Sequence, residues 1–318
     1  MPYYGLKPGE YPIDVLYDRM REITVDAFED QTLNSRFLPL IHHSRIAGVT
    51  QIPEIRKGIA RAVKEFPSNT VHSVHYPFDP KHRVTGKSFT KDLLRFLPWY
   101  EKWGISSAVM HPSKGKENTI GEMVDIFADP KLTSQLEKSS VTLAVENMNS
   151  EDDFFADLDN LVQFREQLLE RYSQMGLHYL TDQIAFCFDT GHYLKYAQEK
   201  GIDPKSQDMT QKLVHFSSHV KVFHISTNTG FRDNHVFIRD KKMPLPPNKA
   251  KDLRKSDPEQ NLLVKNSHQM MEWLKVCVDH RHPNYALEFL HEVNDFITPE
   301  TLAYIGKWMN QVLYSEDF

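Results

Sequence analysis

Nine histidine, aspartate and glutamate residues stand at, or just after, the ends of six strand-like runs in the sequence. Imidazole and carboxylate groups are ligands for divalent metal ions. When several apolar strands each end in such a group, a parallel barrel can gather the groups at its mouth and build a metal site there. The nine residues are His75, His111, Glu146, Asp189, His192, His224, Asp233, His235 and Glu288.

The ligand types indicate which ions such a site would bind. Imidazole combined with carboxylate suits zinc, manganese or iron better than calcium or magnesium. The chain has two cysteines, Cys187 in a predicted buried strand and Cys277 in a predicted helix, and no CxxC pair, so the ligands would be nitrogen and oxygen. Nine ligands exceed what one tetrahedral ion uses, and we expect about three divalent ions per chain, with zinc as the first choice.

Two pairs of these residues are close in the sequence. Asp189 and His192 flank a Thr-Gly pair after the sixth predicted strand, and we expect Gly191 to allow a tight turn that swings the imidazole back toward the mouth. Asp233 and His235 are alternate residues, so an extended backbone would point both in the same direction.

Each of these residues also has an ordinary structural explanation. A single strand-end histidine more often bonds to the backbone than to a metal, and His72 competes with His75 on the same strand. Glu146 and Glu288 could form salt bridges, and Asp189 could cap the following helix. These explanations do not account for polar residues at the same relative position on six strands, whereas a metal site does.

Short apolar or β-branched runs alternate with amphipathic stretches along the whole chain, which is typical of repeated βα units and a parallel sheet. We predict strands at residues 3–6, 36–42, 70–76, 106–111, 141–146, 184–189, 220–225 and 285–289. We predict helices at residues 13–23, 53–66, 88–102, 120–127, 155–173, 207–216, 262–278 and 299–313. Pro53 and Pro299 fall in the first turn of two of these helices, where a missing N–H costs nothing.

Eight alternating strands and helices predict an α/β fold, a (β/α)8 TIM barrel in a single domain over residues 1–318. No Gly/Ser-rich or Pro-rich linker divides the chain, and its 40% hydrophobic content suits a sizeable core. An open doubly wound sheet is the alternative. It would need a glycine-rich phosphate turn, and neither GxGxxG nor GxxxxGK[ST] is present.

The amino-terminal residues lack the basic start and apolar core of a secretory signal, and no apolar run reaches the roughly 18 residues of a membrane span. We therefore expect a cytoplasmic protein without a membrane partner. Nothing in the sequence indicates a protein partner.

A net charge of −5 argues against an overall electrostatic attraction to nucleic acid, but one segment is basic. We predict a long loop after the seventh strand, at residues 226–260, and between residues 232 and 255 it has eight basic residues against three acidic ones. Charge runs of this kind are often simply solvated. If the loop contacts a substrate, the candidates are Arg232, Arg239, Lys241 and Lys242.

The remaining histidines do not stand at the ends of predicted strands three to eight. We treat His215, His219 and His268 as structural or surface residues. His42 ends the second predicted strand and His43 follows it, and these are the two that could contact a substrate.

At these residues the sequence resembles the xylose isomerase-like barrel superfamily, and within it the endonuclease IV family of apurinic/apyrimidinic endonucleases. The similarity extends over strands three to eight, residues 70–289. Its specific parts are DTxH after strand six and DxH after the histidine of strand seven. The segments VHYPFD, HISTNTGF and YALEF depart from the family pattern, which affects DNA specificity more than metal binding.

The resemblance implies a trinuclear metal centre with shared ligands. It would place one zinc on His75, His111 and Glu146, a second on Glu146, Asp189, His224 and Glu288, and a third on His192, Asp233 and His235. It also implies a hydrolase that cleaves a phosphodiester of DNA at an abasic site. Glu146 and Glu288 would be its catalytic residues, orienting the nucleophile.

A sugar or sugar-phosphate isomerase or epimerase of the same superfamily is the alternative. Such enzymes share a four-residue core, carried here by Glu146, Asp189, His224 and Glu288, and generally do not need the other five ligands. About one ion per chain would then be expected, with a small phosphorylated or sugar substrate in place of DNA. A barrel kept as a binding or scaffold protein, without metal or activity, is the third alternative.

Overall fold

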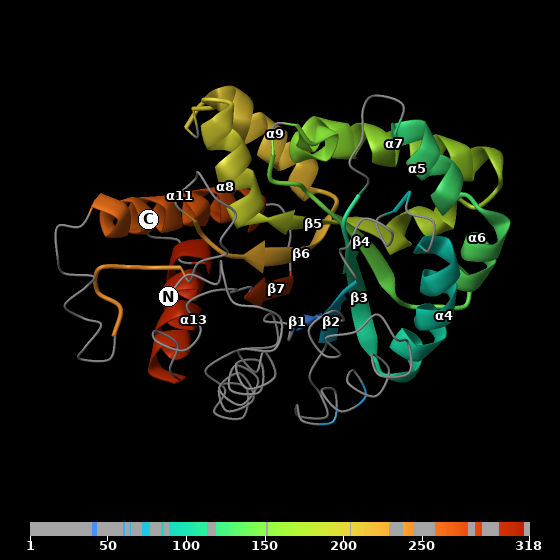
Figure 1. The fold of residues 1–318 in the computed structure, drawn as a ribbon, viewed down its shortest axis with the longest axis horizontal. Helices are drawn as coiled ribbons and strands as arrows, with labels where there is room; N and C mark the ends of the chain where they lie inside the picture. Colours follow the sequence, from blue (N-terminus) through green and yellow to red (C-terminus); the bar gives the residue numbers. More distant parts are fainter. Residues whose placement is uncertain are drawn as a thin grey trace, which may run out of the picture.

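The computed structural model describes residues 40–42, 60, 64, 72–76, 84–85, 89–112, 119–150, 152–203, 205–228, 238–244, 258–278, 284–287 and 299–314. In these parts of the chain, short strands lie at the centre and helices lie around them (Figure 1).

The strands form one parallel sheet in which neighbours in the sequence are neighbours in space. They are β1 Leu40–His42, β2 His72–His75, β3 Ile105–Met110, β4 Thr142–Glu146, β5 Ile184–Asp189, β6 Val220–Ile225 and β7 Asn284–Leu287. Seven predicted strands are thus confirmed, and β5 and β6 have the predicted bounds. The strand predicted at residues 3–6 lies outside the described residues.

The strand order supports a barrel over the doubly wound alternative. From β1 to β7 each strand pairs with the next one along the chain, and every pair is parallel. A doubly wound sheet has a switch point where this order reverses. The described strands contain no such reversal.

Six helices correspond to predicted ones: α4 Phe89–Lys102, α5 Thr119–Phe127, α7 Leu158–Gln174, α9 Gln207–Ser217, α11 Pro258–Val278 and α13 Pro299–Tyr314. Successive helices pack on one another, α5 on α7, α7 on α9, α9 on α11 and α11 on α13. The helix predicted at residues 13–23 lies outside the described residues, as does most of that at 53–66, of which residues 60 and 64 are helical. None of the described helices combines the length and apolar composition needed to cross a lipid bilayer.

Four further helical elements are additions to the predicted set: η2 Phe154–Ala156, η3 His178–Gln183, α6 Pro130–Leu136 and α8 Thr190–Glu199. α6 begins with a local signal, because the Asp129 carboxylate accepts the backbone N–H of Lys131 at 2.8 Å and Pro130 occupies the first turn. α8 begins in the same way at Asp189 and belongs to the site described below.

The inner face of the sheet is filled by small side chains. Val109, Ala144, Cys187 and Val222, one each from β3, β4, β5 and β6, form a buried cluster separate from the main hydrophobic core. Because successive side chains of a strand alternate between its faces, their neighbours point toward the helices. The sheet therefore has an inner layer of its own, which is a property of barrels.

The outer face of the sheet is packed with aromatic rings. Phe186 and Phe188 of β5 contact Phe216 of α9, with ring centroids 5.0 and 5.6 Å apart, and Phe188 also contacts Phe223 of β6 at 5.9 Å. All four rings are buried. Both faces of the sheet are thus covered, which explains why its strands are nearly continuous apolar runs in the sequence.

The packing of α7 yields a stability prediction. Phe164 is fully buried against Phe127, so we expect Phe164→Ala to lower the free energy of unfolding by about 3–5 kcal/mol. Leu169 lies on the same helix and is 40% exposed, so Leu169→Ala should change it by no more than about 0.5 kcal/mol. Urea denaturation of the two variants measures the difference, and equal effects would contradict the described packing.

Candidate metal centre

The candidate ligands lie directly beyond the small inner side chains, at the carboxyl ends of the strands. Residues two apart share a strand face, so Glu146 follows Ala144 on the inner face of β4, and Asp189 follows Cys187 on that of β5. Asp189 is paired in register with His224 of β6. Strand alternation and parallel pairing therefore bring these polar groups to one level of the interior.

Glu146 is the centre of the group. Its carboxylate is fully buried, and its Oε2 atom lies 3.2 Å from His75 Nε2 and 3.2 Å from His111 Nε2. Its Oε1 atom lies 3.0 Å from His224 Nδ1 and 3.7 Å from His192 Nδ1. Side chains from four other segments thus converge on one carboxylate.

Asp189 contributes one carboxylate oxygen to the site and uses the other for the backbone. Its Oδ2 atom lies 3.8 Å from His224 Nδ1, while Oδ1 accepts the backbone N–H of His192 at 2.7 Å. Asp189 is therefore the N-cap of α8, as its alternative interpretation held. Because one oxygen caps the helix and the other faces His224, the capping role and a ligand role are compatible.

The tight turn expected after Asp189 is wrong, because the chain enters α8 at Thr190. Gly191 is needed for a different reason. A Cβ atom on it would lie 2.3 Å from Ser226 Oγ and 3.3 Å from Asp189 Oδ1, distances that require the neighbours to move. The glycine lets the first turn of α8 approach the end of β6 closely.

A hydrogen bond to the backbone determines which ring nitrogen of His75 carries the proton. Its Nδ1 atom lies 2.7 Å from the carbonyl oxygen of Tyr76, which can only accept, so Nδ1 carries the proton. A neutral His75 then turns the lone pair of Nε2 toward Glu146 Oε2. Two acceptors facing each other repel unless a proton or a metal ion lies between them.

The electrostatics of the site favour the forms that bind metal. Burial alone would raise the pKa of Glu146, but the nearby His224, together with hydrogen bonds from His111, His224 and His75, holds this pKa well below its usual value. Burial lowers the pKa of His111 to about 4, against the opposing effect of Glu146. At neutral pH the site therefore has a carboxylate and at least one neutral imidazole, the protonation states that ligate metals.

The donor separations fit shared divalent ions. His75, Glu146 and His224 each offer one ligand atom, and these atoms lie within 4.8 Å of one another; the same holds for Glu146, Asp189 and His192. Ligands about 2.0–2.1 Å from a tetrahedral zinc are roughly 3.3 Å apart. The imidazole nitrogens lie 3.0–3.2 Å from the oxygens of Glu146 and, for His224, 3.8 Å from Asp189 Oδ2, which is close to that spacing. The buried donor set therefore fits ions of this kind.

Six of the nine predicted ligands are thus brought together, and the other three, Asp233, His235 and Glu288, lie outside the described residues. Arg232 and His43 lie outside them as well. His42 is the last residue of β1, as the predicted bounds of the second strand have it, and its backbone is in register with His75. Two residues outside the predicted set are buried at the site, Asn147 directly after Glu146 and Thr190 directly after Asp189. Their position next to a predicted ligand is the signal that could have identified them.

Three of the predicted basic contacts lie in the described segment 238–244. Arg239 is fully buried, its backbone N–H donates to Ser267 Oγ at 2.9 Å, and its guanidinium donates to Gln260 Oε1. A contact between Arg239 and a nucleic acid would require this side chain to leave its buried position. Lys241 and Lys242 are exposed.

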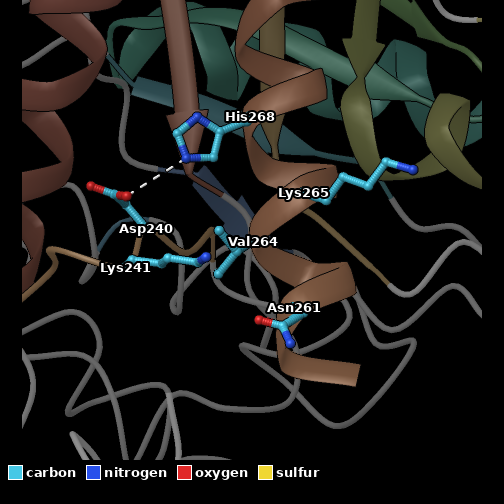
Figure 2. A pocket seen from close by; sticks show the side chains of 6 residues that line it. All are labelled: Asp240, Lys241, Asn261, Val264, Lys265 and His268. Atoms are coloured by element: carbon cyan, nitrogen blue, oxygen red, sulfur yellow. Dashed lines mark ion pairs between the residues drawn. The ribbon is translucent and has the colours of Figure 1, made fainter. Parts of the chain in front are cut away.

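Lys241 borders a pocket of about 520 Å³ beside α11 (Figure 2). The pocket is lined by Asp240, Lys241, Asn261, Val264, Lys265 and His268. The Asp240 carboxylate pairs with His268 at 3.6 Å and accepts the Tyr304 hydroxyl. With two lysines against one aspartate, the lining of the pocket has an excess of positive charge.

No protein-family model and no curated protein matches the chain, whereas solved structures match most of its length. A xylose isomerase-like TIM barrel protein from Mycobacterium smegmatis in complex with magnesium is 11% identical, with a TM-score of 0.51 over 96% of this chain and 90% of that one. The IOLI protein with a bound zinc atom is 13% identical, with a TM-score of 0.53 over 96% and 94%. Endonuclease IV from Thermus thermophilus is 12% identical, with a TM-score of 0.50 over 96% of both chains. At these identities the matches establish the fold alone, which is that of xylose isomerase-like TIM barrel proteins.

The lowered pKa of His111 predicts how stability depends on pH in metal-free protein. Between the usual pKa of 6.5 and the folded value of about 4, the unfolded chain binds a proton that the folded chain does not, so stability falls as pH falls. The expected loss from pH 7 to pH 4 is about 3 kcal/mol, since each unit is about 1.4 kcal/mol. The depressed pKa of Glu146 acts in the same direction at lower pH, because its stabilisation is lost as pH falls through the folded value.

Urea unfolding in the presence of a chelator, at several pH values between 4 and 7, measures this effect. His111→Gln cannot titrate and should show a correspondingly smaller loss of stability. The same pH dependence in both proteins would contradict the assignment to His111.

Proposed function

We propose that the chain is a metal-dependent phosphodiester hydrolase that acts at abasic sites in DNA, and that its predicted first strand completes an eight-stranded barrel. The observation that carries the proposal is the convergence of His75, His111 and His192 on Glu146. A single-ion site would need only the acidic residues and His224. Three additional imidazoles, of which His75 and His192 are buried and His111 is partly buried, support a cluster of ions.

The ions proposed here are divalent, zinc in first place, with manganese or iron as alternatives. Bound at this site, they would neutralise phosphate charge and lower the pKa of a coordinated water. His75, His111 and Glu146 would hold one ion, and Glu146, Asp189 and His224 a second. His192 would hold a third together with Asp233 and His235. Glu146 lies between the first two groups and would be their shared ligand.

We assign the orientation of the nucleophile to Glu288, with Glu146 beside it. In the register of the sheet, Ala286 of β7 pairs with His224. Glu288 comes two residues after Ala286, so strand alternation predicts that it shares the face of Ala286 at the carboxyl end of β7. A carboxylate in that position would complete the second group and accept a proton from the attacking water.

The basic pocket beside α11 is the proposed contact for the DNA backbone. Lys241 and Lys265 line it, and Lys242 is exposed next to Lys241. α11 follows β6 in the chain, so the first turn of α11 belongs to the same end of the barrel as the strand ends that carry the ligands. Backbone phosphates beside the reacting one would therefore come within reach of these ammonium groups.

A sugar or sugar-phosphate isomerase or epimerase is the second candidate. It is favoured by the fold shared with a xylose isomerase-like TIM barrel protein in complex with magnesium, and by the proximity of His224 to both Glu146 and Asp189 within the larger site. One ion on these three residues and Glu288 would chelate a hydroxy-ketone, and the two glutamates would transfer the proton. The number of ions separates the candidates, about three for the hydrolase and about one for the isomerase.

The first test combines a metal count with a cleavage assay. Protein purified without chelator should contain about three divalent ions by elemental analysis, and it should nick a DNA duplex that carries one abasic site. Glu288→Gln should retain most of its metal and lose activity by roughly 10²–10⁴-fold, since it removes a proton acceptor in the reaction. Chelator should abolish nicking, and re-addition of zinc should restore it.

An intact duplex of the same sequence is the control substrate. Fully metallated protein that leaves the abasic duplex uncut would remove the hydrolase from consideration. A single ion per chain, together with turnover of a ketose or its phosphate, would establish the second candidate in its place.

The second test concerns the DNA contact. Lys241→Ala and Lys265→Ala should each weaken binding of abasic DNA to chelator-treated protein and reduce the slope of log affinity against log salt by about 1. Lys138 is an exposed lysine that precedes β4 and so belongs to the opposite end of the strands, and Lys138→Ala is the matched control. Titrations at several salt concentrations measure the slopes. Equal slopes in all four proteins would contradict a role for the pocket.

A further inference from the structure

Asn147 is the first residue after β4, and it makes four hydrogen bonds to the segment that carries two candidate ligands. Its backbone N–H donates to the carbonyl of Cys187 at 3.3 Å. Its side-chain Nδ2 donates to the carbonyl of Asp189 at 3.1 Å, and its Oδ1 accepts the backbone N–H of Asp189 at 2.7 Å. Its own carbonyl lies 2.8 Å from His192 Nδ1. The residue is fully buried.

The side chain of Asn147 acts as an extension of the β-ladder. The backbone pairing of β4 with β5 ends at Glu146 and Cys187. Two residues further along β5, the amide group of Asn147 pairs with both the N–H and the C=O of Asp189. An asparagine side chain can do this because it has a donor and an acceptor on one planar group. The pairing holds the Asp189 backbone at the point where β5 changes into α8.

The backbone carbonyl of Asn147 determines the tautomer of His192. A carbonyl oxygen can only accept, so the Nδ1 atom that faces it must carry the proton. In neutral His192 the lone pair is then on Nε2. Ligating histidines in proteins commonly have their other nitrogen fixed in this way, by a carbonyl or a carboxylate.

We propose that Asn147 is the positioning residue of the site, holding the backbone of Asp189 with its side chain and presenting Nε2 of His192 as the ligand atom with its carbonyl. The inference rests on the metal centre of the proposed function, but it does not depend on the substrate. Asn147 contacts a proposed ligand of the second ion, Asp189, and a proposed ligand of the third, His192, and itself binds no metal. Aspartate would be a poor replacement, because it lacks the donor and would add a negative charge beside Glu146 and Asp189.

The tautomer can be measured in the wild-type protein. Long-range proton–nitrogen correlation spectra of uniformly labelled, metal-free protein distinguish the two neutral forms of a histidine ring, and His192→Gln identifies the signals of His192. We expect the proton on Nδ1. A proton on Nε2 would overturn the proposal.

The role of the side chain is tested by Asn147→Ala. Zinc affinity, measured by competition with a chromophoric chelator, should fall by about 10–100-fold, as is typical when a group that orients a ligand is removed. The backbone carbonyl remains in this variant, so the tautomer of His192 should be unchanged. Loss of affinity with an unchanged tautomer is a result that a general loss of stability would not produce.

Asn160→Ala is the matched control. Asn160 also donates its side-chain amide to a backbone carbonyl, that of Phe154 at 2.6 Å, but at the start of α7. This variant should keep wild-type zinc affinity even where its unfolding free energy falls. Wild-type zinc affinity in folded Asn147→Ala would overturn the role of the side chain. If that variant does not fold, the tautomer of His192 in the wild-type protein still decides the role of the carbonyl.

The outcomes separate this inference from the proposed function. Zinc binding that depends on Asn147, in a protein that leaves abasic DNA intact, would support the inference and remove the hydrolase. Cleavage of abasic DNA by a protein in which Nε2 of His192 carries the proton would support the hydrolase and remove the inference. A wild-type protein that binds no zinc would remove both.

Discussion

The site depends on one constraint, a buried carboxylate that several imidazole nitrogens face at close range. Neutral His111 and His224 can each donate a ring N–H to this carboxylate, but neutral His75 cannot, because its Nδ1–H faces the Tyr76 carbonyl and the lone pair of its Nε2 faces Glu146. A proton between His75 and Glu146 would make the ring a buried imidazolium ion, and burying a charge is costly. Shared divalent ions satisfy the same contacts with neutral rings, and the donors around Glu146 have the spacing that such ions require.

The parallel sheet meets this constraint through its register. Small residues such as Ala144 and Cys187 fill the inner layer, and the polar group of each strand comes two residues later, at the carboxyl end. A register shift of one residue would turn every one of these groups toward the helices, so the outer packing around Phe186 and Phe188 also holds the ligands in place. The alternation of side chains along each strand therefore specifies both the hydrophobic core and the site.

This shared alternation explains how much the sequence could predict. The apolar runs of β5 and β6 end sharply at a polar residue or a turn, so their bounds and the positions of Asp189 and His224 could be predicted from the sequence. Contacts between distant segments could not. Asp189-Thr-Gly-His favours a turn by composition, yet it begins α8 with Asp189 as the N-cap, and the close approach of Gly191 to Ser226 of another segment could not be foreseen. Asn147 was missed for the same reason, since its partners are about 40 residues further along the chain.

The number of buried imidazoles bears most directly on the chemistry. Both candidate functions use Glu146, Asp189 and His224, so these residues alone do not distinguish a hydrolase from an isomerase. His75 and His192 are at most 4% exposed, and His111 adds a third ring that faces the same carboxylate. A protein with one ion would use Glu146, Asp189 and His224 as ligands, and the other three rings would serve only as hydrogen-bonding groups around Glu146. A polynuclear centre gives every ring a ligand role, and attack on a phosphodiester is the reaction class in which charge develops on several oxygens at once and several ions are of use.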